Sequence, residues 1–249
     1  MARPRSWRRV VLGGLACAGA LALIPAGSAG AATTVSFTGS VGPAIRVVPK
    51  RPLPVSLGIK LGISSDTPGE LPATLDRTTI LFPYGSQLNS RLFPSCSAAA
   101  LNRRGLRACP KGSRIGSGFA VGVGDTVRQR LTATLFNGPR GRSITFHLSG
   151  TNPLRVNTAF SAPLTTLRGG KYQYRLQVDV PQNLQVIAGV PISVTEFETT
   201  VRATRRVGGR KRSYVEAFSC PPGAQVPLRG TFTFLGAPTV TRDSWITCG

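Results

Sequence analysis

Polar and apolar residues alternate along most of the chain, as expected of β-strands that bury one face. Between residues 172 and 180 an apolar side chain stands at every second position, and the intervening positions hold Gln173, Arg175, Gln177 and Asp179. Short stretches of the same kind recur at close spacing. Strands are predicted on this basis at 34–38, 45–48, 55–63, 74–82, 115–123, 126–135, 143–148, 156–160, 172–180, 192–205, 213–220 and 228–235.

Turn signals between these stretches predict hairpins. Asparagine and glycine tolerate the positive φ angles that tight hairpin turns require, so such pairs between two alternating runs indicate antiparallel neighbours. Within 192–205 the apolar register shifts between Val194 and Phe197, which predicts a β-bulge. The predicted hairpin turns are Asn137-Gly138, Gly169-Gly170 and Gly208-Gly209.

The 20 prolines and 29 glycines are scattered along the chain, which argues against long helices. One short helix is predicted at 97–102, with Ser95 or Ser97 as its N-cap and Gly105 ending it. Many short strands separated by turns are typical of a β-sandwich or barrel. The sequence therefore predicts an all-β protein, an antiparallel β-sandwich of jelly-roll or immunoglobulin-like type, with one short helix in a disulfide loop.

The first 31 residues have the order of a secretory signal. Four arginines precede an uncharged run at 10–24, and Ala29-Gly30-Ala31 offers the small residues that a signal peptidase needs. The uncharged run is shorter than the roughly 20 residues that span a bilayer. We expect cleavage before Ala32, export by the general rather than the twin-arginine route, and no integral membrane anchor afterwards. The predicted organisation is a signal at 1–31, an N-terminal β-ribbon and linker at 32–53, and a β-sandwich body at 54–249.

Charge suggests the kind of partner. The chain has 31 basic and nine acidic residues, a net charge of +22. Removal of the signal leaves 27 basic residues and a net charge of +18. Such a charge favours salt-dependent association with polyanions. For an exported protein these include anionic cell-wall polymers and acidic glycans. The predicted location is therefore extracellular, either secreted or associated with the cell wall.

Cysteine usage agrees with export. Cys17 lies in the predicted signal, and the remaining four form an even set, which in an exported chain indicates disulfides. Three connectivities are possible, and proximity in sequence favours the pairs Cys96–Cys109 and Cys220–Cys248. There is no C-x-x-C motif, and the single histidine is distant from every cysteine in the sequence. We therefore predict no metal site and no cofactor.

No catalytic motif stands out. His147, the only histidine, falls on the polar face of its strand and is expected to be exposed. Gly116-Ser117-Gly118 lacks the spacing of a nucleophile elbow. Glu196 and Glu198 would lie about 7 Å apart on one strand face, near the separation that glycosidases use. Such a pair is more typical of a solvated face opposite arginines. The chain is predicted not to be an enzyme, and an extracellular hydrolase acting on a glycan or ester is the alternative.

The most distinctive local feature is a basic hairpin around Gly208-Gly209. Its charges are expected at one projecting tip, where guanidinium groups could bind phosphates or carboxylates. The competing interpretation is that turns tolerate charge and that basic edges discourage aggregation. Aromatic residues are not interleaved with the charges, so no sequence-specific nucleic-acid binding is predicted. The six candidate residues are Arg202, Arg205, Arg206, Arg210, Lys211 and Arg212.

Smaller groups of basic residues lie at other turns. These are Arg140 with Arg142, Arg168 with Lys171, and Arg103, Arg104 and Arg107 inside the first predicted disulfide loop.

Two cysteine-containing segments carry a resemblance. The first holds Leu92-Phe93-Pro94-Ser95-Cys96-Ser97 and then the run 109–118, and the second runs from Tyr214 to Pro222, followed by Phe232-Thr233-Phe234 and Cys248. Together they resemble a group of secreted actinobacterial proteins of unknown function. In that group a P-x-C-S…A-C-P-x-G-S-x-I-G-x-G loop precedes a β-rich body. The resemblance supports the pair Cys96–Cys109 and implies no activity.

These observations together predict a secreted, non-enzymatic surface or cell-wall-associated protein that binds an anionic polymer or acidic glycan.

Overall fold

The computed structural model describes residues 32–44 and 51–249. The predicted signal at 1–31, the strand predicted at 45–48 and the first part of the predicted linker lie outside the described residues. Over the described part the chain is dominated by β-strands, so the prediction of an all-β protein is confirmed.

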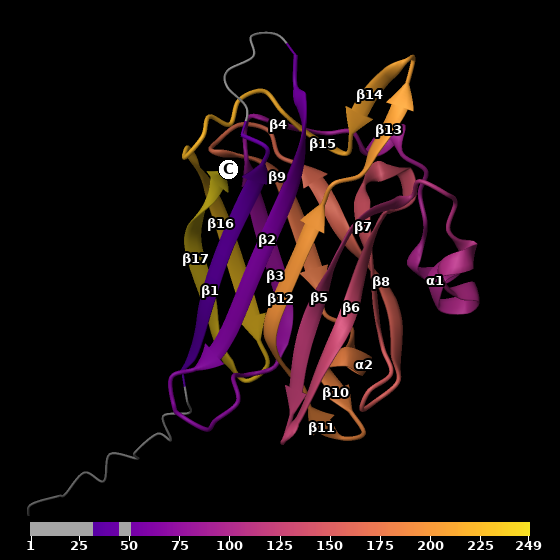
Figure 1. The fold of residues 1–249 in the computed structure, drawn as a ribbon. Helices are drawn as coiled ribbons and strands as arrows, with labels where there is room; N and C mark the ends of the chain where they lie inside the picture. The colour runs from indigo at the N-terminus through magenta and orange to yellow at the C-terminus, as the bar shows by residue number, and fades with distance from the viewer. Residues whose placement is uncertain (1–31, 45–50) are drawn as a thin grey trace, which may run out of the picture. The chain divides into compact units, whose positions relative to one another are not determined.

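Eleven strands form one closed sheet, an 11-stranded barrel (Figure 1). Neighbours run antiparallel throughout, except for the parallel pair of β1 and β17. In spatial order the barrel strands are β1 (Thr33–Gly42), β17 (Ala237–Cys248), β16 (Gln225–Phe234), β3 (Leu75–Pro83), β9 (Tyr172–Asp179), β8 (Val156–Thr166), β7 (Ser143–Gly150), β6 (Val127–Asn137), β5 (Arg114–Gly124), β12 (Ser193–Val201) and β2 (Leu53–Ser65), which pairs with β1 again.

Pairing between the two chain-terminal strands of the barrel completes the closure. Gly39 of β1 faces Ile246 of β17, and the parallel pairing continues to Val41 and Cys248. A Cβ atom at Gly39 would lie 2.8 Å from Cγ1 of Ile246, so glycine allows the close approach. The predicted sandwich is thereby corrected: hydrogen bonding continues around the ring and does not separate into two sheets. The predicted ribbon at 32–53 contributes β1, which is part of the barrel wall.

Shorter elements lie outside the eleven-stranded ring. Two small strands extend the sheet beyond β2, and two further hairpins form separate two-stranded sheets. The remaining elements are β4 (Ser86–Leu88), β10 (Val186–Ile187), β11 (Val190–Pro191), β13 (Thr204–Val207), β14 (Arg210–Ser213), β15 (Val215–Ala217), α1 (Ala98–Arg104), α2 (Gln182–Gln185), and the 3-10 turns η1 (Ser90–Leu92), η2 (Gly105–Ala108) and η3 (Pro139–Gly141).

The strand predicted at 192–205 is two strands, β12 and β13. The break falls at Arg202 and Ala203, whose backbone N–H groups both donate to the carbonyl of Ile115. The predicted bulge is confirmed, because the pairing of β12 with β5 shifts register between Val194 and Glu196. The turns at Gly169-Gly170 and Gly208-Gly209 join paired strands as predicted, and Asn137-Gly138 leads into the β6–β7 connection.

The predicted helix is confirmed as α1. The hydroxyl of Ser97 accepts a hydrogen bond from the N–H of Ala100 at 3.2 Å, and Gly105 ends the helix at a φ of 67°. The helix packs on the outer face of β8. There the side chain of Asn102 both donates to the carbonyl of Ala159 and accepts from its N–H, at 2.8 and 2.7 Å. The outer surface of this part of the barrel is therefore covered.

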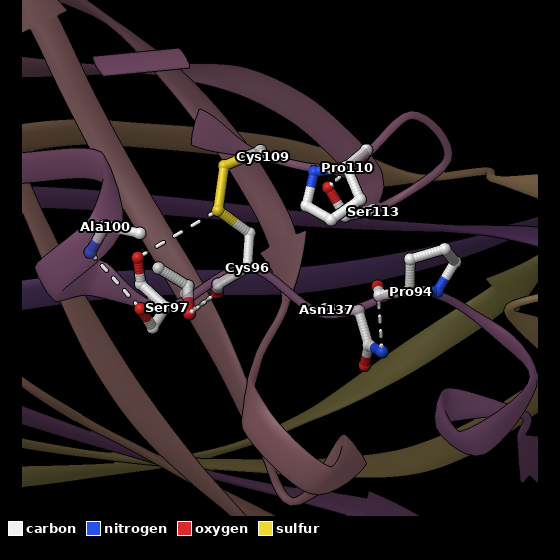
Figure 2. Close-up of a disulfide and its surroundings, with 9 residues drawn as sticks. Pro94, Cys96, Ser97, Ala100, Cys109, Pro110, Ser113 and Asn137 are labelled. Atoms are coloured by element: carbon white, nitrogen blue, oxygen red, sulfur yellow. Dashed lines mark hydrogen bonds between the residues drawn. A yellow bond between two sulfur atoms is a disulfide. The ribbon is translucent and has the colours of Figure 1, made fainter. Parts of the chain in front are cut away.

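Both predicted disulfides are present, Cys96–Cys109 and Cys220–Cys248. Figure 2 shows the first of them beside the Ser97 cap of α1. A buried cluster forms where the disulfide loop meets the barrel, and includes Cys96, Leu101, Phe136 and Ala159. The disulfide thus holds the helix-bearing loop against β6 and β8. Two disulfides are the expected chemistry of an oxidising compartment outside the cytoplasm.

Candidate anion-binding site

The predicted basic hairpin is present as β13 and β14 (Figure 1). Directly opposed residues of a hairpin share a face, and successive residues alternate between faces. The basic residues of this segment are therefore divided over two faces and do not form one patch at the tip. One face carries Arg205, Arg210 and Arg212, the other carries Arg206 and Lys211, and Arg202 precedes the hairpin.

Five arginines converge at the foot of the hairpin, in a pocket of about 980 Å³. Its walls come from η1, from β14 and from the connections β6–β7 and β8–β9. In an antiparallel barrel every second connection returns to the same end, which brings these segments together. We call this site the arginine pocket, after the five arginines that line it: Arg91, Arg140, Arg142, Arg168 and Arg212.

Arg212 anchors the pocket to the protein interior. Its Nε and Nη2 donate to the two carboxylate oxygens of Glu216, each at 2.9 Å, and the Glu216 side chain is 2% exposed. Burial alone would raise the pKa of Glu216, but hydrogen bonds from Arg212 and from the Ser213 N–H outweigh it and hold the pKa below its usual range. Glu216 is therefore ionised, and its oxygens are already engaged by these donors.

Asn137 connects two walls of the arginine pocket through hydrogen bonds. Its side chain is buried and donates to the carbonyl oxygens of Ser90 and Phe93, both at 2.9 Å, and its Oδ1 accepts from the Tyr214 hydroxyl. The hydroxyl of Ser90 in turn donates to the carbonyl of Gly141. Burial raises the pKa of the Tyr214 phenol, which keeps it a hydrogen-bond donor. This network fixes η1 and the β6–β7 connection relative to each other.

The backbone at the pocket rim is constrained. Arg140 has a φ of 57°, in the left-handed region that costs a non-glycine residue free energy. Next to it, Gly141 has a φ of 64°, and a Cβ atom there would lie 2.6 Å from the Ser90 hydroxyl. Such strain is concentrated at functional sites in proteins. Here it presents the Arg140 side chain from the rim of the pocket.

Within the described residues no carboxylate lines the arginine pocket. Four other carboxylates form ion pairs with basic side chains outside the pocket, and Glu216 is paired with Arg212. Arg91, Arg140, Arg142 and Arg168 therefore face the pocket as exposed, uncompensated charges. Like charges held together in a concave site create a strong positive potential there.

The prediction that His147 is exposed is wrong, because its side chain is 3% exposed. Alternation correctly placed it on the outer face of β7, but α1 and the disulfide loop cover that part of the barrel. Its Nε2 lies 2.7 Å from Oδ1 of Asn157, and its Nδ1 has no hydrogen-bond partner. The histidine does not line the arginine pocket.

The other catalytic candidates are also accounted for. Glu198 pairs with Lys60 at 3.2 Å and Glu196 with Arg128 at 3.7 Å, as expected for a solvated strand face opposite basic residues. Gly118 lies within β5, where a Cβ atom would overlap the carbonyl oxygen of Glu198. The glycine therefore serves strand packing.

In the part of the chain that the structure describes, no group of three or more histidine, cysteine, aspartate or glutamate side chains could hold a metal ion. Over the same residues, no helix has the length and hydropathy needed to cross a membrane. Comparison of the chain with protein-family models, with curated proteins and with solved structures finds no match.

Proposed function

We propose that this chain is an exported, non-enzymatic surface or cell-wall-associated protein that binds an anionic polymer through the arginine pocket. The observation that carries the proposal is the convergence of five arginines in one pocket that no carboxylate of the described residues lines. The site differs from the hairpin tip suggested by the sequence, and it shares only Arg212 with it.

Arginine suits this role. Its planar guanidinium binds phosphate and carboxylate oxygens in a bidentate manner and keeps its charge at all physiological pH values. A volume of about 980 Å³ is at the upper end of the roughly 300–1,000 Å³ of ordinary ligand sites. The pocket can therefore hold more than one charged unit of a repeating polymer.

The lining of the arginine pocket supports binding rather than catalysis. Its described residues include no histidine, cysteine, aspartate, glutamate or lysine, so Tyr174 is the one side chain there of a type that commonly transfers protons. An extracellular hydrolase acting on a glycan or ester remains the alternative, with less support. Tyr174 is the one aromatic residue of the lining. Stacking of successive bases requires several aromatic side chains, so a specific nucleic-acid ligand is not proposed.

The experiment is salt elution from immobilised polymers. The quadruple variant Arg91→Gln, Arg140→Gln, Arg142→Gln and Arg168→Gln is compared with a control that loses the same charge elsewhere, Arg103→Gln, Arg104→Gln, Arg107→Gln and Arg206→Gln. All eight side chains are exposed. We expect the pocket variant to elute at clearly lower salt than the control. Equal elution of the two variants would show that net charge alone governs binding and would overturn the proposal.

Two immobilised polymers separate the possible sources of negative charge. Poly(glycerol phosphate) represents wall phosphopolymers, and polygalacturonate represents acidic glycans. A third variant, with Arg206, Arg210 and Lys211 changed to Gln, tests the outer part of the hairpin. Under the proposal it elutes with the parent protein or close to it. A larger shift than that of the pocket variant would return the site to the hairpin.

A further inference from the structure

The barrel encloses a second cavity, distinct in character from the arginine pocket. Its volume is about 360 Å³, and every barrel strand except β17 contributes to its lining. The cavity lies among the inward-facing side chains, including Phe37, Leu61, Leu131, Phe146 and Leu176. It belongs to the protein interior and does not lie in a surface groove.

A void of this size is unusual in a folded protein. Interiors are packed as densely as organic crystals, with few gaps larger than a water molecule. An engineered apolar cavity of about 150 Å³ already binds benzene. The cavity here is more than twice as large and falls within the roughly 300–1,000 Å³ of ligand sites. Its size therefore points to an occupant.

The lining defines the chemistry of that occupant. Of the described residues that form it, none is charged, and the polar side chains are those of Thr78, Gln129 and Thr199. The amide of Gln129 already donates to the carbonyl of Leu154. An ionised group inside would lose its hydration with no compensating partner. The occupant must therefore be apolar along the length that the barrel encloses.

One end of the cavity is open. Val127, Leu154 and Val190 line the cavity and are also 45, 44 and 37% exposed, so they form its mouth. They lie on the β5–β6 hairpin, the β7–β8 connection and the β10–β11 hairpin, lowermost in Figure 1. At the other end of the lining, Ile144 and Val201 are each 8% exposed. We call the three exposed residues the apolar mouth.

The cavity is also elongated. Its lining on β6 runs from Val127 at the mouth to Leu135, which corresponds to about 26 Å along the strand at ordinary strand rise. At the mouth, Gly124 leaves room for the segment that follows β11, because a Cβ atom there would lie 2.6 Å from Cδ1 of Ile192. An elongated apolar space that opens at its mouth fits a linear aliphatic chain.

We propose that the barrel binds the aliphatic chain of a lipid, inserted tail first through the apolar mouth, with its polar head left in solvent. The site is independent of the arginine pocket: the two linings share no residue. It goes beyond the polymer binding proposed above and does not depend on it.

The test uses N-phenyl-1-naphthylamine, an uncharged probe that becomes fluorescent in apolar surroundings, with the full exported protein. We expect saturable binding, and displacement by straight-chain primary alcohols whose affinity rises about fourfold for each added methylene. Leu131→Trp fills the cavity and should weaken probe binding at least about tenfold. Absence of saturable binding to the parent protein would overturn the proposal.

Substitutions at two exposed positions distinguish a loss of probe binding from a loss of folding. Leu154→Asp places a charge in the apolar mouth, whereas Leu235→Asp makes the same change at a site of similar exposure, 46%, that does not line the cavity. The proposal requires Leu154→Asp to weaken probe binding and Leu235→Asp to leave it unchanged. Equal effects of the two would show that the probe binds elsewhere. Elution of the arginine-pocket variants is measured separately, so either proposal can fail alone.

Discussion

The guanidinium of Arg212 is bound by both carboxylate oxygens of Glu216, each at 2.9 Å, and the glutamate is almost completely buried. Arg212 is itself partly exposed and lines the arginine pocket, so the ion pair connects that pocket with the buried strand β15. A buried carboxylate is tolerated only when its hydrogen bonds are satisfied. Glu216 meets that condition through Arg212 and the Ser213 N–H.

Glu216→Gln should destabilise the protein by about 2–4 kcal/mol at pH 7, because an amide cannot accept both arginine donors in a buried site. The folded-state pKa of Glu216 is depressed, so its contribution is present above its ordinary pKa of 4.5 and is lost as the pH falls through the folded value. The difference in unfolding free energy between parent and variant should therefore shrink below about pH 4.5.

Urea unfolding at pH 7, 5 and 3.5 measures that difference. The control is Asp243→Asn, which removes the exposed ion pair of Asp243 with Arg229 and should change stability much less. A difference for Glu216→Gln that stays constant over this range would contradict the assignment of an ionised, buried Glu216.

Removal of the Cys220–Cys248 disulfide should lower stability by about 3–4 kcal/mol, the value expected for a cross-link spanning 28 residues. The bond holds the end of β17, where Cys248 pairs with Val41 of β1. Hydrogen exchange in the Cys220→Ser, Cys248→Ser variant should therefore be fastest at the β1–β17 seam. Uniform acceleration around the barrel would show instead that the bond has no local role in closure.

Alternation along the chain was sufficient to predict most strands, but not the closure of the barrel. The segment that forms β17 shows only a weak apolar alternation, because Arg242 and Ser244 stand at the positions between Val240 and Ile246 on the same face. It was not predicted, and without it the ring cannot be inferred. Its parallel pairing with β1 joins residues about 200 positions apart, for which the sequence carries no local signal.

The candidate sites, too, could be predicted from the sequence only in part. Arg140, Arg142 and Arg168 were recognisable as charges beside turns, but Arg91 lies in a segment with neither alternation nor a turn motif. Only the tertiary structure brings them together. His147 was placed on the correct strand face and yet is buried, because the covering helix comes from a segment about 45 residues earlier. The apolar cavity could not be predicted from the sequence, because its lining residues are ordinary core residues.

Gly118→Ala should destabilise the protein by more than about 3 kcal/mol, because the new methyl group would overlap the backbone of Glu198 in the neighbouring strand β12. Backbone atoms of a paired strand cannot move aside without loss of the pairing. Gly122→Ala in the same strand is the control. Its Cβ atom would lie 3.1 Å from a methyl carbon of Ile192, a side chain that can adjust. Thermal unfolding of the two variants should differ clearly, and similar melting temperatures would contradict the close approach at Gly118.

Arg140→Gly separates stability from binding. Glycine relieves the left-handed backbone of Arg140, and this gain exceeds the added flexibility of the unfolded chain, so stability should rise by up to about 1 kcal/mol. The same change removes a guanidinium from the arginine pocket and should lower the salt needed for elution from an anionic polymer. Ala188→Gly is the matched control, since Ala188 has a φ of 51° and lies outside that pocket. It should gain similar stability with unchanged elution. If Arg140→Gly gains stability and elutes with the parent protein, then its strained conformation serves no role in anion binding.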